Sequence, residues 1–392
     1  MATALEKVHL KRTKRLLGGH LWVFSNEIYE NLKNYAAGML VEVFDMHDLF
    51  LGIGYINPQS LISIRLLTRE KEEINRDFFR RRIKDAFDLR KRLLGERDAF
   101  RLIYSEGDYL PGLIADKYAN SLVLQFLTAG TEEFRDIIIG ALDELLNPEI
   151  IVLRNESRVR TLEGLPLYKE VIKGDLQALP VIRENGLLFE LDPYEGQKTG
   201  FFLDQQENRA SLKKYAGAGK GLDLFCYLGA WSMHLASAGA EVVGVDASEK
   251  AVMRARKIAG MNGLTGRASF IKDDVFSFLE RELASTGKKY DFIVLDPPAF
   301  VKSAAKIKEA VKAYRELNEM SMRLLKPGGL LATSSCSYHL SKELFADMLH
   351  SAGRNARRSL RLIELRSQSP DHPVLLSMPE TEYLKCAFLI VD

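Results

Sequence analysis

The segment from residue 221 to residue 246 constrains the fold more than any other part of the chain. An apolar run over residues 221–226 leads to a turn at Gly229, a helical pattern follows over residues 230–238, and a second apolar run ends at Asp246. This order of strand, glycine turn, helix and strand predicts the opening βαβ unit of a doubly wound sheet. Ligands of such sheets bind outside the carboxyl ends of the strands, so we expect a ligand crevice beside Gly229 and Asp246.

The alternation of strands and helices continues to the end of the chain. Strands are predicted near residues 221–226, 241–246, 268–271, 291–295, 329–335, 361–366 and 383–390, and helices near residues 230–238, 248–259, 274–284, 307–325 and 341–352. Regular alternation builds a parallel sheet with helices on its faces. A loop, instead of a helix, separates the last two strands and predicts a final hairpin. The sequence therefore predicts an α/β domain with a seven-stranded sheet whose last strand is antiparallel.

Two smaller domains are predicted to precede this α/β domain. Residues 1–72 contain short apolar runs between turn residues and no long helical pattern, which is typical of a small β-rich module. Residues 73–190 begin with an amphipathic helix over residues 75–94 and end near a hairpin at Asn185-Gly186, which predicts a central α+β domain. The α/β domain then occupies residues 191–392.

Composition bounds the compartment and the partners of the protein. The 55 basic and 53 acidic side chains leave a formal net charge of +2, which neither requires nor excludes a polyanionic partner. The widely spaced cysteines, Cys226, Cys336 and Cys386, form neither a disulfide framework nor a metal-binding pattern, which favours a reduced cytoplasmic compartment and predicts no metal site. We expect no signal peptide and no membrane partner, because the chain lacks a suitable apolar segment near its start and any run of about eighteen apolar residues.

Two clusters of basic residues suggest contact with RNA. One runs from Lys7 to Arg15 and precedes Trp22 and Phe24, and cations next to aromatic rings suit phosphates and stacked bases. The other lies on the predicted helix over residues 75–94, whose basic side chains outnumber its acidic ones and would follow a phosphate backbone. The alternative is that both rings are core residues and both clusters are solvated surface.

The turn after the first strand of the α/β domain distinguishes between two kinds of cofactor. It contains Gly229 alone and lacks the G-x-G-x-x-G pattern that cradles a pyrophosphate, which favours S-adenosylmethionine over a dinucleotide. Asp246 would accept hydrogen bonds from the ribose hydroxyls, and Asp274, at the end of the third strand, would bind the adenine amino group. The alternative for Asp274 is the N-cap of a helix.

Two further strand ends carry residues suited to pyrimidine chemistry. Asp296 is followed by two prolines, which fix the path of the chain so that a planar base would be held against Asp296 and Phe300. Cys336 follows the next strand, and neighbouring strands lie about 4.8 Å apart, so Asp296 and Cys336 would meet one base. A thiolate that adds to C6 of a pyrimidine makes C5 nucleophilic enough to accept a methyl group. The alternative is that Cys336, like Cys226 and Cys386, is a small buried apolar residue.

A combination of motifs resembles one known family over essentially the whole chain. The motifs of the α/β domain are Gln197-Lys-Thr-Gly-Phe-Phe-Leu-Asp204, Leu222-Asp-Leu-Phe-Cys-Tyr-Leu-Gly229, Asp296-Pro-Pro-Ala-Phe300 and Ser335-Cys336-Ser337. Together they resemble the bacterial and archaeal 23S ribosomal RNA 5-methylcytosine methyltransferases. Gly19-His-Leu-Trp-Val-Phe24 resembles that family's PUA domain, and Ser105-Glu-Gly-Asp-Tyr-Leu-Pro-Gly-Leu-Ile114 resembles its central domain. The resemblance implies a Rossmann-like class I methyltransferase domain behind a PUA domain and a central α+β domain.

The resemblance also implies roles for individual residues. Cys336 would be the nucleophile and Asp296 would orient the cytosine through its N3/N4 edge. The residues implied in contacts with the base are Pro297, Pro298 and Phe300. The residues implied in binding S-adenosylmethionine are Lys198, Phe202, Asp204, Arg209, Asp223, Tyr227, Gly229, Asp246 and Asp274.

Two positions depart from the family pattern. Gln206 stands where the family usually has a basic residue. Ala230-Trp231 replace the usual glycine and phenylalanine after the donor-binding turn, a change that we expect only to repack the turn. No second cysteine lies near Asp296 in the sequence, so we expect the chemistry to depend on one thiol. The residue that removes the C5 proton is not identified.

The expected substrate is 23S ribosomal RNA, protein-free or in an early assembly intermediate, and the protein would act as a monomer or homodimer. Three other functions fit parts of the sequence. An RNA guanine-N2 or adenine-N6 methyltransferase would need no thiol and would tolerate Cys336→Ala. A uracil methyltransferase with the same thiol chemistry would differ only in its product. An RNA-binding assembly factor that has lost catalysis would fail to bind S-adenosylmethionine.

Overall fold

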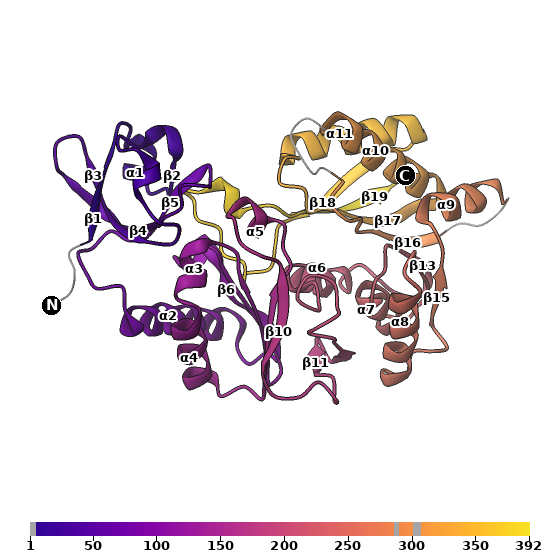
Figure 1. Ribbon diagram of the computed structural model, residues 1–392. Helices are drawn as coiled ribbons and strands as arrows, with labels where there is room; N and C mark the ends of the chain where they lie inside the picture. The colour runs from indigo at the N-terminus through magenta and orange to yellow at the C-terminus, as the bar shows by residue number, and fades with distance from the viewer. Residues whose placement is uncertain (1–4, 286–289, 301–306) are drawn as a thin grey trace. The chain divides into compact units, whose positions relative to one another are not determined.

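The computed structural model describes residues 5–285, 290–300 and 307–392, which form two compact units (Figure 1). The first unit comprises the residues up to Ile182, Glu190–Leu203 and Pro370–Thr381, and the second comprises Arg183–Phe189, Asp204–Ser369 and Glu382–Asp392. The predicted first and central domains therefore share one unit. The domain boundaries placed after residues 72 and 190 stay predictions.

The first unit begins with the β-rich module expected from the sequence. Its sheet has the order β1-β3-β4-β5-β2, with β1 parallel to β3 and the other neighbours antiparallel. The strands are β1 (Glu6–Leu10), β2 (Trp22–Phe24), β3 (Leu40–Asp45), β4 (Phe50–Ile56) and β5 (Ile62–Thr68), and helix α1 (Lys14–Leu17) follows β1. Alternating apolar side chains such as Val8, Val43 and Ile64 are fully buried and form its core.

A second sheet in the first unit has the order β10-β9-β8-β7-β6, in which β8 and β9 are parallel. Its strands are β6 (Ala99–Tyr104), β7 (Leu113–Tyr118), β8 (Ser121–Phe126), β9 (Ile150–Asn155) and β10 (Tyr168–Lys173), and its helices are α2 (Arg76–Leu94), α3 (Ala129–Glu133), α4 (Arg135–Leu146) and α5 (Val159–Leu162). The Asn75 side chain accepts hydrogen bonds from the backbone of Asp77 and Phe78 and so begins α2. Phe79 and Ile83 of α2 pack into the same core as Leu102.

The basic residues of the first unit correct part of the RNA-binding expectation. Arg90 of α2 is 1% exposed, and its Nη2 lies 2.7 Å from Asp108 Oδ2, so Arg90 does not belong to a phosphate-binding face. Trp22 is half-buried, its indole N–H donates to Glu106 Oε1 at 2.7 Å, and the Arg65 guanidinium lies over its ring. Trp22 is therefore held by protein contacts that stacking on a base would have to replace.

The loop between the last two strands contributes to the first unit. Residues Pro370–Thr381 are grouped with that unit, and Met378 is buried in the core of the first sheet. The backbone N–H of Arg101 donates to Asp371 Oδ2 at 2.8 Å, and Tyr104 Oη donates to the Thr381 carbonyl at 2.9 Å. The loop predicted between the last two strands is therefore an ordered structural element.

The described residues of the second unit form a seven-stranded sheet with the order β15-β14-β13-β16-β17-β19-β18. Its strands are β13 (Gly219–Leu224), β14 (Ala240–Asp246), β15 (Ala268–Lys272), β16 (Tyr290–Leu295), β17 (Leu325–Ser335), β18 (Leu360–Arg366) and β19 (Lys385–Val391). Strands β13 to β17 are mutually parallel where they pair, and β19 is antiparallel to both β17 and β18. The antiparallel last strand agrees with the prediction.

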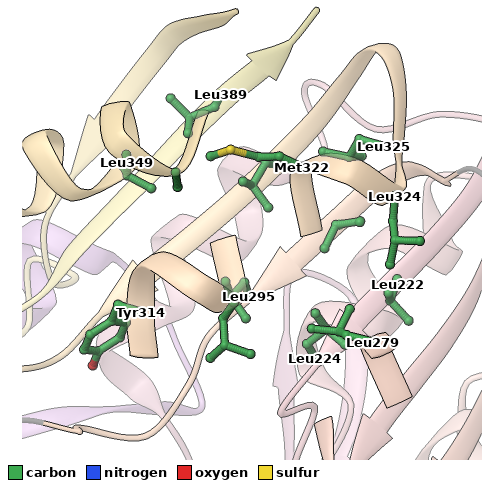
Figure 2. Packing of buried hydrophobic residues seen from close by; sticks show 14 of the residues in the cluster. Leu222, Leu224, Leu279, Leu295, Tyr314, Met322, Leu324, Leu325, Leu349 and Leu389 are labelled. Atoms are coloured by element: carbon green, nitrogen blue, oxygen red, sulfur yellow. The ribbon is translucent and has the colours of Figure 1, made fainter. Parts of the chain in front are cut away.

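Helices cover both faces of this sheet (Figure 1). They are α6 (Gln206–Leu212), α7 (Ala230–Ser237), α8 (Glu249–Met261), α9 (Val275–Ala284), α10 (Ile307–Leu324) and α11 (Lys342–Ala356). Helices α7 and α8 contact β13 to β15, whereas α10 packs against α9, α11, β16 and β17. Figure 2 shows part of the core between the sheet and α9 to α11, a single buried cluster that includes Leu222, Leu279, Leu295, Met322 and Leu349. This two-sided burial leaves the strand ends as the place for polar residues.

The remaining regular elements are short. Strands β11 (Val181–Glu184) and β12 (Leu187–Glu190) form the hairpin predicted at Asn185-Gly186, whose positive φ values of 51° and 86° suit a two-residue hairpin turn. Single 3₁₀ turns occur at Ser25–Glu27, Leu32–Asn34, Ser105–Asp108, Leu203–Gln205 and Pro379–Thr381. In the ranges that the structure describes, no helix is both long enough and apolar enough to cross a membrane.

Candidate active site

The turn between β13 and α7 has a strained backbone. Phe225 and Tyr227 have positive φ values of 63° and 48°, and Gly229 follows with a φ of 72°. A Cβ atom on Gly229 would lie 2.6 Å from a ring carbon of Phe270, so the position accepts only glycine. Non-glycine residues in this region cost free energy and concentrate at functional sites, which supports a ligand at this turn.

Asp246 ties the turn to the end of β14. Its Oδ2 accepts the backbone N–H of Tyr227 at 2.9 Å, and its Oδ1 accepts the backbone N–H of Ser248 at 2.9 Å. The side chain is half-buried, and each carboxylate oxygen keeps a further lone pair. Asp246 therefore has the position and the acceptor capacity that ribose hydroxyls require.

Asp223 is a buried carboxylate with one oxygen still to be satisfied. Its Oδ2 accepts the Ser232 backbone N–H at 2.9 Å and the Ser232 hydroxyl at 2.6 Å. Its Oδ1 is buried without a hydrogen-bond partner among the described residues, and burial raises the pKa of Asp223 to about 7. The positively charged amino group of S-adenosylmethionine is a donor of the kind that this oxygen lacks, so the residues around the turn fit that cofactor.

Asp274 caps a helix, which was the alternative expected from the sequence. Its Oδ1 accepts the backbone N–H of Ser277 at 3.0 Å at the start of α9, and the side chain is exposed. A cap uses only part of the acceptor capacity of a carboxylate. A contact between Asp274 and adenine stays a prediction.

The predicted cofactor residues near position 200 divide between the two units. Lys198 and Phe202 belong to the first unit, where the Lys198 ammonium lies 4.5 Å from the centre of the Phe202 ring. In the second unit, Asp204 accepts a hydrogen bond from the Tyr383 hydroxyl at 2.7 Å. Arg209 is buried and forms a two-pronged ion pair with Glu184 at 2.6 and 2.7 Å. This pair gives Arg209 a structural contact with the β11–β12 hairpin, and its role toward the cofactor stays a prediction.

Two side chains from distant parts of the sequence hold Asp296. The Gln205 side-chain amide donates to Asp296 Oδ1 at 3.1 Å and also to the Ser334 hydroxyl at 3.1 Å. The Trp231 indole N–H donates to Asp296 Oδ2 at 3.1 Å. The expectation that Trp231 only repacks the turn is therefore wrong, because its N–H contacts the carboxylate that was predicted to orient the base. These donors fix the orientation of the carboxylate.

Cys336 follows the strand next to the one that precedes Asp296. Strands β16 and β17 are parallel neighbours, with Leu295 beside Thr333. Asp296 comes one residue after Leu295, whereas Cys336 comes three residues after Thr333. Relative to Asp296, Cys336 therefore lies two residues further along the strand direction, or about 6 to 7 Å. The Cys336 side chain is half-buried, whereas Cys226 and Cys386 are buried. Of the three thiols, Cys336 is the one placed to meet a substrate at the carboxyl edge.

Tyr314 of α10 connects the loops that carry Asp296 and Cys336. Its hydroxyl lies 3.4 Å from the Pro298 carbonyl and 3.1 Å from the Ser337 hydroxyl. Pro298 is an exposed residue. The Phe300 ring packs on Tyr314 with a centroid distance of 4.8 Å. Pro297 is buried. Tyr314 thus fixes both loops, and contacts of the prolines and Phe300 with a base stay predictions.

Sequence reasoning missed several residues of this site. Gln205 lay within the polar segment before α6 but carried no signal of its own. Gln206, which departs from the family pattern, is buried in α6 with its Oε1 lacking a hydrogen-bond partner among the described residues. Tyr314 was hidden in the apolar pattern of α10. Lys385 is buried at the start of the apolar strand β19, and a lone charged residue there was a signal that could have been found.

A cavity of about 520 Å³ lies at the opposite edge of the sheet. It is lined at the amino ends of β13 to β16 by residues that include Lys220, Glu241, Arg267 and Lys326. The Lys326 ammonium pairs with Asp291 at 2.8 Å, and the lining cations are exposed. Ligands of doubly wound sheets bind at the carboxyl ends, so the candidate active site is the edge that carries Gly229, Asp296 and Cys336. No group of three potential metal ligands occurs in the part of the chain that the structure describes.

Comparison with known proteins identifies families and relatives that the chain matches. Residues 7–69 match the family model of a PUA-like domain, and residues 168–380 match that of the S-adenosylmethionine-dependent methyltransferases. The chain is 37% identical over 383 residues to ribosomal RNA large subunit methyltransferase I of Pseudoalteromonas atlantica, which covers 96% of this chain and 97% of that protein. It is 40% identical over 380 residues to the protein of the same name from Aeromonas salmonicida, covering 95% and 96%.

A solved structure shares the fold over nearly the full length. It is that of a Streptococcus mutans protein described as a SAM-dependent methyltransferase, with a TM-score of 0.84 and 23% sequence identity. The match covers 98% of this chain and 100% of that chain. The arrangement of elements described above therefore occurs as a whole in a second protein.

Proposed function

Because the chain belongs to the S-adenosylmethionine-dependent methyltransferases, in the family of the ribosomal RNA large subunit methyltransferase I proteins, we propose that it methylates C5 of a cytosine in large-subunit ribosomal RNA. S-adenosylmethionine is its methyl donor. One observation carries the choice of C5: Asp296 and Cys336 follow neighbouring strands at the edge that also bears the donor-binding turn. A carboxylate and a thiol together are what a cytosine needs to react at C5.

The thiol would act twice in the reaction. The Cys336 thiolate attacks C6 of the cytosine, forming an S–C6 bond and making C5 an enamine carbon. C5 then takes the methyl group that bound S-adenosylmethionine supplies. Loss of the C5 proton to a base lets the S–C6 bond break, which restores the aromatic ring and returns the thiolate. Cys226 and Cys386 are buried, and burial raises their pKa values, so Cys336 performs both steps alone.

Asp296 would orient the base before the thiol attacks. Gln205 and Trp231 donate to its two oxygens and hold the carboxylate at the end of β16. An ionised carboxylate accepts from the cytosine N4 amino group, and it binds a protonated N3 as the adduct forms. Asp223, Tyr227, Gly229, Asp246 and Asp274 would hold S-adenosylmethionine at the neighbouring strand ends.

The first unit would bind the ribosomal RNA. The basic side chains of Lys11, Arg12 and Lys14 around α1 are exposed, and the Arg15 guanidinium lies over the half-buried Phe24 ring. Such side chains neutralise phosphates without reading the sequence, while a flipped-out cytosine enters the active site. We propose protein-free RNA or an early assembly intermediate in the cytoplasm as the substrate, with the enzyme acting as a monomer or homodimer.

The direct test measures methyl transfer from labelled S-adenosylmethionine to protein-free ribosomal RNA. Wild type and Cys336→Ala are compared, and the labelled nucleoside is identified by mass spectrometry. We expect label in 5-methylcytidine with wild type and none with the variant. Label in a purine, or full activity without the thiol, would instead indicate a guanine-N2 or adenine-N6 methyltransferase. Label in 5-methyluridine would move the same chemistry to uracil, and failure to bind S-adenosylmethionine would indicate an assembly factor without catalysis.

A further inference from the structure

Lys385 places a buried ammonium beside the loop that carries Cys336. Lys385 is 4% exposed and is the first residue of β19, where it pairs with Ser335 of β17. Its Nζ donates to the Ser337 carbonyl at 2.7 Å and to the Tyr383 carbonyl at 2.8 Å. Contacts to the residues before and after Cys336 therefore hold the lysine beside this segment, within range of an electrostatic interaction with Cys336.

The acceptors of this ammonium are neutral. Within the described residues no carboxylate lies within ion-pair distance of Lys385, and the nearby Glu382 is occupied by Lys342 Nζ at 2.7 Å and by the Ser367 hydroxyl at 3.0 Å. Burial lowers the pKa of Lys385 to about 8. A buried cation without an anionic partner is costly, and an apolar residue of similar size would often be more stable. Fold stability alone therefore does not explain the lysine.

The charged and titratable groups around Lys385 come from four elements. They are Cys336 after β17, Glu382 before β19, Lys342 at the start of α11, and Tyr314 of α10, whose hydroxyl is hydrogen-bonded to Ser337. Glu382 and Lys342 neutralise each other. Cys336 is thus the group whose ionisation would give Lys385 an anionic partner.

We propose that Lys385 is a positioning residue for the nucleophile, whose ammonium holds Cys336 as a thiolate and whose contact with Ser337 fixes the loop. This inference rests on the proposed function of Cys336. An ordinary cysteine has a pKa of about 8.5 and is mostly protonated at neutral pH, and a nearby cation lowers that pKa. Because Lys385 itself keeps its proton below a pKa of about 8, its charge is present in the neutral range where the enzyme would need a thiolate.

The test measures the reactivity of Cys336 in the full-length protein without RNA or cofactor. Iodoacetamide alkylation of the Cys336 peptide is followed by mass spectrometry from about pH 6 to about pH 10 in wild type, Lys385→Met and Lys214→Met. We expect Lys385→Met to slow alkylation at pH 7 about tenfold and to raise the midpoint of the pH profile by about one unit. Lys214→Met removes an exposed lysine from the same unit and should leave the rate within about twofold of wild type.

Two further variants make the test decisive. Lys385→Gln keeps an N–H donor for the Ser337 carbonyl but lacks the charge, so it should behave like Lys385→Met, and Lys385→Arg should restore part of the reactivity. Thermal melting confirms that each variant is folded, and Lys385→Gln replaces Lys385→Met if the latter is not. An unchanged alkylation profile in the folded neutral variant overturns the inference. Methyl transfer by Cys336→Ala is a separate readout, and its persistence would overturn the proposed function.

Discussion

Buried carboxylates of the first unit and carboxylates at the ligand edge of the second unit are stabilised in different ways. In the first unit, Asp108 and Asp116 each face an arginine, with Arg90 Nη2 and Arg101 Nε at 2.7 and 2.6 Å from them. At the carboxyl edge of the second unit, the contacts of Asp223 and Asp246 come from backbone N–H groups and a serine hydroxyl. No cationic side chain lies within ion-pair distance of these two acids in the part of the chain that the structure describes.

This difference distinguishes carboxylates that stabilise the fold from carboxylates that are available to bind a ligand. The charge of a carboxylate paired with a buried arginine is neutralised within the fold, and removing one partner is costly. A carboxylate held by neutral donors keeps its charge and part of its acceptor capacity. We therefore expect substitutions of the first kind to change stability, and substitutions of the second kind to change binding and catalysis.

The largest effect on stability is expected from Arg90→Met in the first unit. The substitution leaves the buried Asp108 without its guanidinium and should lower the free energy of unfolding by about 3 to 5 kcal/mol, measured by denaturant titration. The double variant Arg90→Met/Asp108→Leu should recover a large part of that loss. If the single variant is as stable as wild type, the Arg90–Asp108 pair does not stabilise the fold, which would contradict the role given to paired carboxylates in the first unit.

Asp296→Asn is expected to lower kcat about 100- to 1,000-fold. Both side chains that hold Asp296 donate hydrogen bonds, and an asparagine amide would present a donor to one of them and would lack the charge. The matched control is Asp291→Asn at the other end of β16, where the carboxylate pairs with Lys326 near the surface. Equal kcat values in the two variants would contradict the role given to Asp296.

Trp231→Phe should lower kcat about tenfold, because a hydrogen bond to a charged acceptor is lost while the ring is largely kept. Trp22→Phe is the control, since Trp22 also donates its indole N–H to a carboxylate, Glu106, but in the first unit. We expect Trp22→Phe to change thermal stability and leave kcat unchanged. Equal losses of activity in Trp231→Phe and Trp22→Phe would contradict a specific role of Trp231 at the active site.

Asp223→Asn should have the smallest effect, and its sign depends on pH. Folding raises the pKa of Asp223 from 3.8 to about 7, so the folded protein binds one more proton than the unfolded chain between these values. The stability of wild type should therefore fall as pH rises through this window, whereas the variant lacks this dependence and should be more stable relative to wild type at about pH 8 than at about pH 5. Thermal melting of both proteins at about pH 5 and pH 8 measures this pH dependence. Added S-adenosylmethionine should stabilise the variant less than it stabilises wild type. Identical pH dependence in both proteins would contradict the assigned pKa.

The strand ends of the second unit could be predicted because their signals are local. Apolar runs that stop at Gly229, Asp246, Asp296 or Cys336 define both the strand and the residue that follows it. The final hairpin was also visible, because no helical pattern separates the last two apolar runs. Parallel neighbours then bring these ends to one edge of the sheet without further information.

Contacts between side chains that lie far apart in the sequence could not be predicted. Gln205 is 91 residues from Asp296, and Trp231 is 65 residues from it, so their hydrogen bonds depend on how the sheet and its helices pack. Arg90 looked like one of many surface cations until its partner Asp108 was located. Residues Pro370–Thr381 likewise gave no signal that they join the first unit.

The covalent bond between Cys336 and C6 of a cytosine is the central step of the proposed reaction. The most direct measurement uses ribosomal RNA in which 5-fluorocytosine replaces cytosine. A base cannot remove the fluorine at C5 as it removes a proton, so the adduct cannot break down after methyl transfer. With S-adenosylmethionine present, wild type should form an RNA–protein complex that survives denaturing electrophoresis, and Cys336→Ala should form none. A complex that persists in Cys336→Ala, or no complex with active wild type, would contradict the mechanism.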